Sequence, residues 1–223
     1  MTGHWFQRPM RIRVYFAKTE AMQYTGHLDL HRAWERTFRR ASLPLAYSQG
    51  FHPQPKLHLA CALPLGFTSQ CEAGDFWLEK ALPLAEIKAA LVRALPPGID
   101  ILRLEEVEEH APALATLVQS AEYVVTLLDR LPSLEEGLTR LLAAKSLPRQ
   151  RRGKSYDLRP LLEGIQRLPD DETGMQRIIL RLSARQAATG RPEEVLAELG
   201  LGIEAARVQR TKLIFMENAR KEG

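Results

Sequence analysis

The sequence contains few of the residues and patterns on which several classes of protein depend. It has two cysteines, Cys61 and Cys71, which is typical of a chain in the reducing cytosol and too few for a disulfide scaffold. It has no apolar run of the roughly 20 residues that cross a bilayer, so we expect no membrane span. The first ten residues lack the apolar core of a signal peptide, so we expect a cytoplasmic protein.

Motifs that mark nucleotide-dependent enzymes and hydrolases are also absent. The sequence has no Walker loop, no Gly-x-Gly-x-x-Gly and no Gly-x-Ser-x-Gly. Cys61 and Cys71 are ten positions apart, unlike the close cysteine pairs of zinc and iron–sulfur sites. The cluster of a radical SAM enzyme needs three closely spaced cysteines, so the chain cannot supply that chemistry itself. The sequence therefore predicts no cofactor and no metal site, and it favours a protein that is not itself an enzyme.

Positive charge is concentrated in two places along the chain. Lys and Arg number 31 against 27 Asp and Glu, and the resulting net charge of +4 is too small by itself to indicate a nucleic-acid partner. Residues 149–159 carry five positive side chains and one negative, a surplus equal to that of the whole chain. A second basic group comprises Arg32, Arg36, Arg39 and Arg40. This segregation is expected either of a surface that binds phosphates or of solvated faces and a linker.

Hydrophobic periodicity predicts two halves, over residues 1–110 and 111–223. In the first half, alternation over 11–18 indicates a strand, and helical spacing over 28–41 indicates an amphipathic helix that Asp29 or His27 is placed to cap. The elements expected next are a strand at 57–64, a strand at 76–79, a helix at 84–95 and a strand at 99–104. The order β-α-β-β-α-β is that of a ferredoxin-like sandwich, with both helices on one face of an antiparallel sheet.

The second half partly repeats this pattern. We expect strands at 123–128, 177–182 and 208–215, a helix that begins with a capping box formed by Ser133 and Glu136, and a short helix that opens at Pro192. The run from Tyr156 to Leu168 is ambiguous. The predicted fold class is therefore α+β, with two ferredoxin-like halves and antiparallel sheets.

Histidines are concentrated near the first helix. Four of the six lie between positions 27 and 58, and His27 and His31 have the spacing that presents two ligands on one helical face. The Glu of a His-Glu-x-x-His metalloprotease is missing, and ordinary capping or hydrogen bonding is the alternative role. Asp29 is placed either to orient one of these histidines or to cap the helix. The candidate ligand-binding residues are His27, Asp29, His31, Tyr47, Phe51 and His52.

Aromatic and basic residues are mixed around the loop that follows this helix. Aromatic side chains stack on bases, and Arg and Lys neutralise phosphates, so the mixture suits single-stranded RNA. The basic loop around Gly153 suits phosphates without sequence readout. The alternatives are that Tyr47 and Phe51 fill a gap between loop and sheet and that the basic loop is merely solvated. The candidate nucleic-acid-binding residues are Arg36, Arg39, Arg40, Lys56, Arg151, Arg152 and Lys154.

Three stretches of the first half, at residues 24–41, 43–56 and 62–69, carry a family resemblance. They begin with Tyr-Thr-Gly-His-Leu-Asp-Leu-His, and a basic segment at 152–160 matches in the second half. The chain resembles the bacterial radical-SAM-linked protein family, a domain of unknown function found beside or fused to radical SAM proteins. Where the family often has Ser before His27, this chain has Gly26. The resemblance implies a radical SAM partner and no established activity.

These observations support three functional hypotheses. The first is a non-catalytic protein that binds RNA or presents a substrate to a radical SAM enzyme, in RNA modification for example. The second is a metal-independent RNA endonuclease, because the double ferredoxin-like layout is similar to that of CRISPR repeat-processing proteins, with His27 as general base. The third is an adaptor that contacts only a protein partner.

Overall fold

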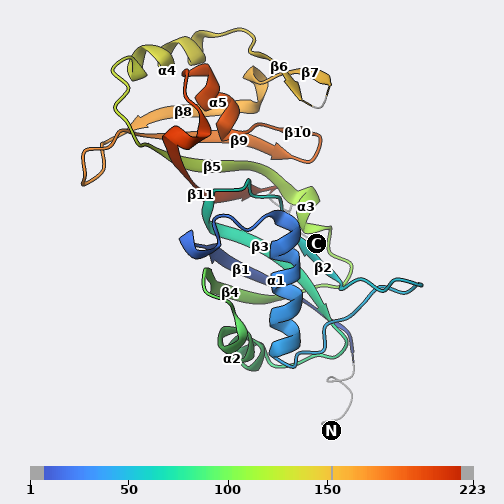
Figure 1. Ribbon diagram of the computed structural model, residues 1–223. Coiled ribbons are helices and arrows are strands. Elements are labelled where there is room, and N and C mark those ends of the chain that lie inside the picture. The colour runs from blue at the N-terminus through green and yellow to red at the C-terminus, as the bar shows by residue number, and fades with distance from the viewer. Residues whose placement is uncertain (1–7, 152, 217–223) are drawn as a thin grey trace, which may run out of the picture. The chain divides into compact units, whose positions relative to one another are not determined.

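The computed structural model describes residues 8–151 and 153–216, and the chain divides into two compact units, Met1–Leu117 and Val118–Gly223 (Figure 1). Each unit has an antiparallel sheet and helices packed against it. In the part of the chain that the structure describes, no helix combines the length and the apolar character that crossing a membrane requires.

The first unit has the order β-α-β-β-α-β. Its antiparallel strands are arranged β4-β1-β3-β2, which is the order of a ferredoxin-like sandwich. The elements are β1 (Met10–Lys18), the 3-10 turn η2 (Glu20–Met22), α1 (His27–Arg40), β2 (Leu57–Leu59), β3 (Thr68–Leu78), α2 (Leu84–Ala94), β4 (Ile99–Val107) and the single turn α3 (Leu114–Leu117).

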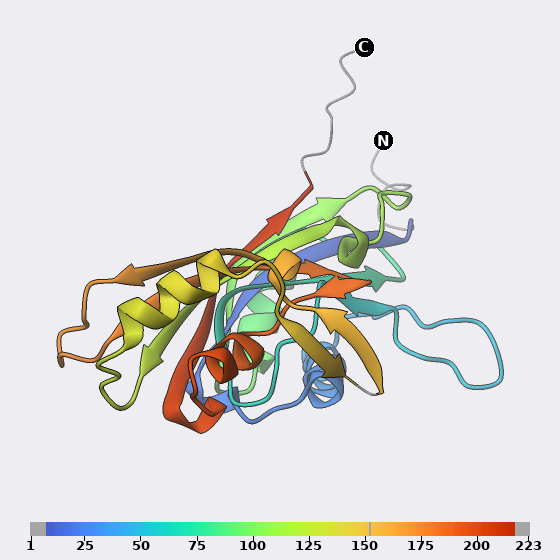
Figure 2. The same ribbon diagram turned by 90° about the horizontal axis from the view of Figure 1, so that it is seen from above.

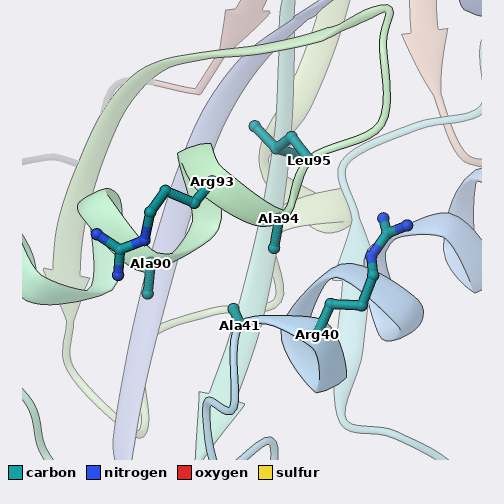
Figure 3. A pocket seen from close by; sticks show the side chains of 6 residues that line it. All are labelled: Arg40, Ala41, Ala90, Arg93, Ala94 and Leu95. Atoms are coloured by element: carbon teal, nitrogen blue, oxygen red, sulfur yellow. The ribbon is translucent and has the colours of Figure 1, made fainter.

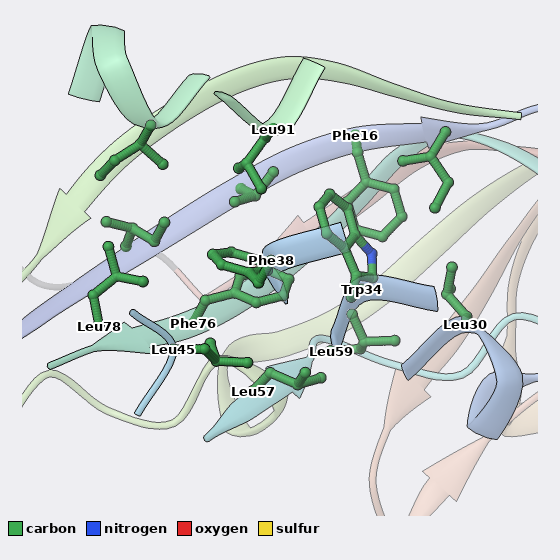
Figure 4. Packing of buried hydrophobic residues seen from close by; sticks show 14 of the residues in the cluster. Phe16, Leu30, Trp34, Phe38, Leu45, Leu57, Leu59, Phe76, Leu78 and Leu91 are labelled. Carbon is green, nitrogen blue, oxygen red and sulfur yellow. The ribbon is translucent and has the colours of Figure 1, made fainter. Parts of the chain in front are cut away.

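Aromatic side chains of α1 hold this helix on the sheet. Trp34 lies edge-to-face on Phe16 of β1 with ring centroids 5.0 Å apart, and Phe38 stacks on Phe76 of β3 at 4.8 Å (Figure 4). All four rings are fully buried, and full burial of such a side chain stabilises the fold by about 1.5–3 kcal/mol. Because these rings turn one face of α1 to the core, the opposite face is left to solvent.

The strands β2 and β3 differ in length from the prediction. Strand β3 covers eleven residues rather than 76–79, and β2 covers three rather than 57–64. The first part of β3 is rich in polar residues, three of which, Ser69, Glu72 and Asp75, are buried. Asp75 is fully buried because the Arg11 and Arg13 side chains pair with its carboxylate at 2.6 and 2.7 Å. Buried charges therefore conceal the apolar alternation by which a strand is recognised.

The predicted helix caps are wrong. Helix α1 begins at His27 with Gly26 at the N-cap and without a side-chain cap, and Asp29 instead pairs with Arg32 at 3.3 Å. Ser133 occupies the N-cap of α4 but makes no capping hydrogen bond, so the capping box is not formed. The backbone of Ser133, with φ −87° and ψ 17°, lacks the extended conformation that directs a capping side chain onto the helix.

The second unit has the same core order, with strands arranged β11-β5-β9-β8. A separate two-stranded hairpin, β6–β7, is inserted before β8 (Figure 1). The elements are β5 (Val118–Leu127), α4 (Leu134–Ala143), β6 (Pro148–Arg151), β7 (Lys154–Asp157), the 3-10 turn η3 (Arg159–Leu161), β8 (Leu162–Leu168), β9 (Arg177–Arg185), β10 (Ala188–Thr189), α5 (Pro192–Glu198), the 3-10 turn η4 (Ile203–Ala205) and β11 (Ala206–Phe215). The prediction of an α+β fold with two ferredoxin-like halves is confirmed.

Candidate nucleic-acid interface

The outer face of α1 carries a row of arginines. Arg32, Arg36 and Arg40 are four residues apart, so they follow one another along one side of the helix. All three are exposed, and in the described part of the chain no carboxylate pairs with Arg36 or Arg40. Arg39 is 70% exposed and lies 3.9 Å from the Glu35 carboxylate, a weak surface pair. The face therefore presents guanidinium groups that remain available for an anionic ligand.

Residues 46–56 form a hairpin-like loop beside this helix. Tyr47 pairs with Pro55, and the amide of Ser48 donates to the carbonyl of Gln54 at 2.8 Å. Gly50 has φ +133°, a conformation that glycine adopts most readily, and it lets the chain turn at the tip. The loop projects away from the body of its unit in both views (Figures 1 and 2).

The aromatic residues of this loop face solvent to different degrees. Phe51 is completely exposed, so the interpretation that it fills a gap against the sheet is wrong. Tyr47 is 39% exposed, and its hydroxyl lies 3.4 Å from the Glu35 carboxylate of α1. Partial burial, together with Glu35, raises the pKa of Tyr47. His52 and Lys56 are exposed on the same loop, so the loop carries aromatic and basic groups that face solvent, and Tyr47 joins it to α1.

His27 and His31 pack against each other in the first turns of α1. Their rings lie edge-to-face with centroids 5.5 Å apart, and both are half-buried. Burial lowers the pKa of both imidazoles. The positive charge of His27 and His58 lowers the pKa of His31 further, whereas Glu72 acts in the opposite direction on His27. Within residues 8–151 and 153–216, no three His, Cys, Asp or Glu side chains are grouped to hold a metal ion.

This histidine pair makes folding stability depend on pH. Both pKa values lie below the ordinary 6.5, so the unfolded chain binds these protons more readily than the native state does. The free energy of unfolding is therefore not reduced by these two histidines above about pH 6.5, and it decreases as the pH falls below that value. We expect urea unfolding of a His27→Gln, His31→Gln double variant to vary less between pH 7 and pH 5 than that of the parent. An unchanged pH dependence contradicts this account.

In the basic stretch of the second unit, two arginines form ion pairs with carboxylates of α5. Arg151 forms an ion pair with Glu194 of α5 at 2.5 Å, donates to the Tyr156 hydroxyl at 2.9 Å and lies over the Tyr156 ring. Arg149 pairs with Glu198 at 2.5 Å. These two arginines hold the β6–β7 hairpin on α5, which leaves less of the predicted charge for phosphates.

The tip of this hairpin remains basic. Lys154 is exposed beside Gly153, whose φ of +76° lies in the left-handed region that glycine favours. Arg152 lies outside the described residues. The predicted nucleic-acid-binding residues are therefore divided between two units, with Arg36, Arg39, Arg40 and Lys56 together in the first.

Sequence reasoning missed the acidic partners of the hairpin and of β1. Glu194 and Glu198 are four residues apart on α5 and match the two-residue spacing of Arg149 and Arg151 on β6. This matched spacing is visible in the sequence once both elements are assigned. No comparable signal marks Asp75, because its partners lie more than sixty positions away along the chain.

Comparisons with solved structures give low similarity. A crystal structure of a Cbf5-Nop10-Gar1 complex matches with a TM-score of 0.47 and 12% identity, over 91% of this chain and 48% of that chain. This chain thus spans about half the length of the chain that it matches. The acetolactate synthase small subunit from Thermotoga maritima matches with a TM-score of 0.25 and 9% identity, over 94% of this chain and 96% of that one. No curated protein matches the sequence.

A family model matches most of the sequence. It covers residues 11–192, which include nearly all of the first unit and most of the second. Its description is "uncharacterized protein conserved in bacteria". The chain therefore belongs to this bacterial family, DUF2344.

Proposed function

We propose that this chain is a non-catalytic RNA-binding protein that works with a radical SAM enzyme. The observation that carries the proposal is the surface formed by the arginine row of α1 and the projecting loop at 46–56. Arg36 and Arg40 are exposed and unpaired within the described residues, and Phe51 is completely exposed at the loop. This surface, with Lys56, is called the α1–loop surface below.

The chemistry of the α1–loop surface suits a single RNA strand. Guanidinium and ammonium groups neutralise phosphates, and bases of any sequence stack on an aromatic ring. A fully exposed phenylalanine contributes nothing to the core, and its ring is accessible for stacking on a base. The lysine and arginines supply the charge that a strand needs beside such a ring.

The proposed radical SAM partner follows from the resemblance of residues 24–41 and 43–56 to the radical-SAM-linked family. The chain has two cysteines, fewer than the three that hold such a cluster. In this proposal the partner therefore carries the cluster, and this chain contributes RNA binding.

Filter binding of single-stranded RNA at several salt concentrations tests RNA binding. Each neutralised phosphate contributes a slope of about 0.7 to the fall of log affinity with log salt. Contacts from Arg36, Arg40 and Lys56 therefore predict a slope of about −2 between 50 and 200 mM salt. Retention that does not respond to salt, or no retention at all, contradicts the proposal.

Phe51→Ala tests the stacking part of the α1–loop surface. Stacking of one base on an aromatic ring contributes about 1–3 kcal/mol, so we expect RNA affinity to fall about 5- to 150-fold. The free energy of unfolding should change by less than about 0.5 kcal/mol, because the side chain is fully exposed. Equal RNA affinity of variant and parent would show that Phe51 does not stack on bases.

An RNA endonuclease is a second candidate, and the state of His27 favours it. Burial lowers the pKa of His27, so its imidazole is neutral at pH 7 and suited to act as a general base toward a 2′-hydroxyl. Labelled RNA incubated with the protein in chelator separates the two candidates. Cleavage that is lost in His27→Ala would show that the chain is a nuclease and would contradict the proposal of a non-catalytic binding protein. RNA that stays intact supports that proposal.

A further inference from the structure

Exposed apolar side chains lie at the N-terminal end of α1. Tyr24 and Leu28 are four residues apart, and they are 75% and 71% exposed. Leu65 of the neighbouring loop is exposed as well, and the amide of Gly66 in that loop donates to the carbonyl of Gln23 at 2.8 Å. Single exposed apolar side chains are ordinary, whereas a group of large ones indicates a surface that contacts another molecule.

The chain around Tyr24 positions its ring. The amide of Thr25 donates to the carbonyl of Met22 at 2.9 Å, which closes the turn that carries Tyr24. The ring lies against the backbone of Gly66, where a Cβ atom would be 4.0 Å from Cε1 of Tyr24. This contact orients the ring and leaves most of it accessible. A planar group that stacks on the ring therefore restricts little further motion, which favours binding.

This apolar group continues the arginine row of α1. Leu28, Arg32, Arg36 and Arg40 are successively four residues apart, so they follow one another along the outer side of the helix. Residues four apart lie about 6 Å apart along a helix axis, which is close to the spacing of phosphates in an extended single strand. Arg36 and Arg40, which have no carboxylate partner within the described residues, therefore match two consecutive phosphates.

The arginine row does not continue onto α2. A pocket opens between the ends of α1 and α2, and Arg40 and Arg93 contribute to its lining. Their side chains extend away from each other, with Ala41 and Ala94 between them (Figure 3). The two guanidinium groups thus do not converge on one ligand. Further contacts to a strand on α1 are therefore expected at the N-terminal end of the helix.

The charges at the N-terminal end favour a base over a phosphate. The Asp29 carboxylate lies 3.3 Å from the guanidinium group of Arg32, and both side chains are exposed. This carboxylate offsets the charge of Arg32 and repels a phosphate, whereas an uncharged base meets no such repulsion. The Tyr24 ring offers the flat aromatic surface on which a base stacks, and Leu28 lies one turn further along the chain.

We propose that Tyr24 stacks on a base of the RNA strand whose phosphates are bound by Arg36 and Arg40. The inference rests on the proposed function and deepens it, because it adds a second stacking residue and sets the course of the strand along α1. A protein partner also covers apolar side chains. The unpaired guanidinium groups that follow Leu28 along α1 favour an anionic strand instead.

Three single variants test Tyr24 by RNA filter binding. Tyr24→Ala removes the ring, and we expect RNA affinity to fall about 5- to 150-fold. Tyr24→Phe keeps the ring, so its affinity should stay within about twofold of the parent. Val92→Ala is the matched control, because Val92 is an exposed apolar residue of α2 in the same unit. It should leave RNA affinity unchanged, and equal melting temperatures show that no loss is due to unfolding.

Photochemical crosslinking locates the base. A short RNA in which every base is 5-iodouracil is irradiated in complex with the protein, and the tryptic peptides are examined by mass spectrometry. We expect RNA to be attached to the peptide of residues 19–32, which contains Tyr24, and this attachment to be lost in Tyr24→Ala. Attachment confined to other peptides, such as the one at 41–56 that contains Phe51, contradicts stacking on Tyr24.

The outcomes separate this inference from the proposed function. If Arg36→Gln weakens RNA binding while Tyr24→Ala does not, RNA binding stands, stacking on Tyr24 is overturned, and the apolar group is left to a protein partner. A Tyr24→Phe variant that binds as weakly as Tyr24→Ala also overturns stacking. If the parent retains no RNA at any salt concentration, both proposals are overturned.

Discussion

Replacing Asp75 with alanine is expected to lower the free energy of unfolding by about 3–5 kcal/mol, because it removes the partner of the buried Arg11 and of the partly buried Arg13. The Asp75 carboxylate is fully buried and receives hydrogen bonds from Arg11 at 2.6 Å and from Arg13 at 2.7 Å. The side chain of Arg11 is only 2% exposed, so its charge cannot turn to water once the carboxylate is gone. Urea unfolding followed by circular dichroism measures this loss.

Asp100→Ala is the matched control for this prediction. Asp100 lies on β4 of the same sheet but is exposed, so its removal should change stability by less than about 0.5 kcal/mol. If Asp75→Ala is as stable as Asp100→Ala, the buried pair does not stabilise the first unit. Arg11 also donates to the carbonyls of Ala111 and Pro112 at 2.6 and 3.0 Å. The connector after β4 should therefore loosen together with the sheet.

The Arg36→Gln, Arg40→Gln double variant is expected to bind single-stranded RNA about 65-fold more weakly than the parent near 50 mM salt. Each lost phosphate contact removes about 0.7 from the salt slope, so the slope should become shallower by about 1.4. Both arginines are exposed, and neither has a carboxylate partner in the described part of the chain. The variant should therefore fold normally, and filter binding at several salt concentrations measures both effects.

A Lys145→Gln, Arg207→Gln double variant controls for net charge. Both residues are exposed and lie in the second unit, and their replacement removes the same two charges. We expect its RNA affinity to stay within about threefold of the parent, because long-range attraction between exposed charges is screened by salt. Equal losses in the two double variants would mean that net charge, and not the α1–loop surface, retains the RNA.

The helices of the first unit could be predicted from the sequence because their apolar residues recur at helical spacing. Strand β1 could be predicted because its apolar residues alternate with polar ones. Leu30, Trp34 and Phe38 recur at helical spacing, and they are the apolar residues that α1 buries. Strand β3 was largely missed, because Glu72 and Asp75 interrupt its apolar alternation while both are buried. Their burial depends on residues of other elements, which no window along the chain can reveal.

The residues of the candidate site were also predicted only in part from the sequence. The four-residue spacing of Arg36 and Arg40 is sufficient to predict that they lie together on one side of a helix. Arg151, in contrast, belongs to the most basic stretch of the chain, yet Glu194 and Tyr156 occupy its guanidinium group. Charge counts describe a stretch of sequence, whereas pairing depends on which carboxylates the fold brings within hydrogen-bonding distance.

Periodicity along the chain was thus sufficient for the α+β class, the ferredoxin-like order of the first unit and the arginine face of α1, whereas strand β8 of the second unit lies in a run that the pattern left ambiguous. Tertiary packing alone decided which charges are buried, which arginines remain unpaired and where a pocket opens between α1 and α2. The physical reason is the separation along the chain between the residues that interact. Helices and strands follow from neighbours within one or two turns, but burial and ion pairing follow from contacts such as Arg11 with Asp75, which join residues 64 positions apart.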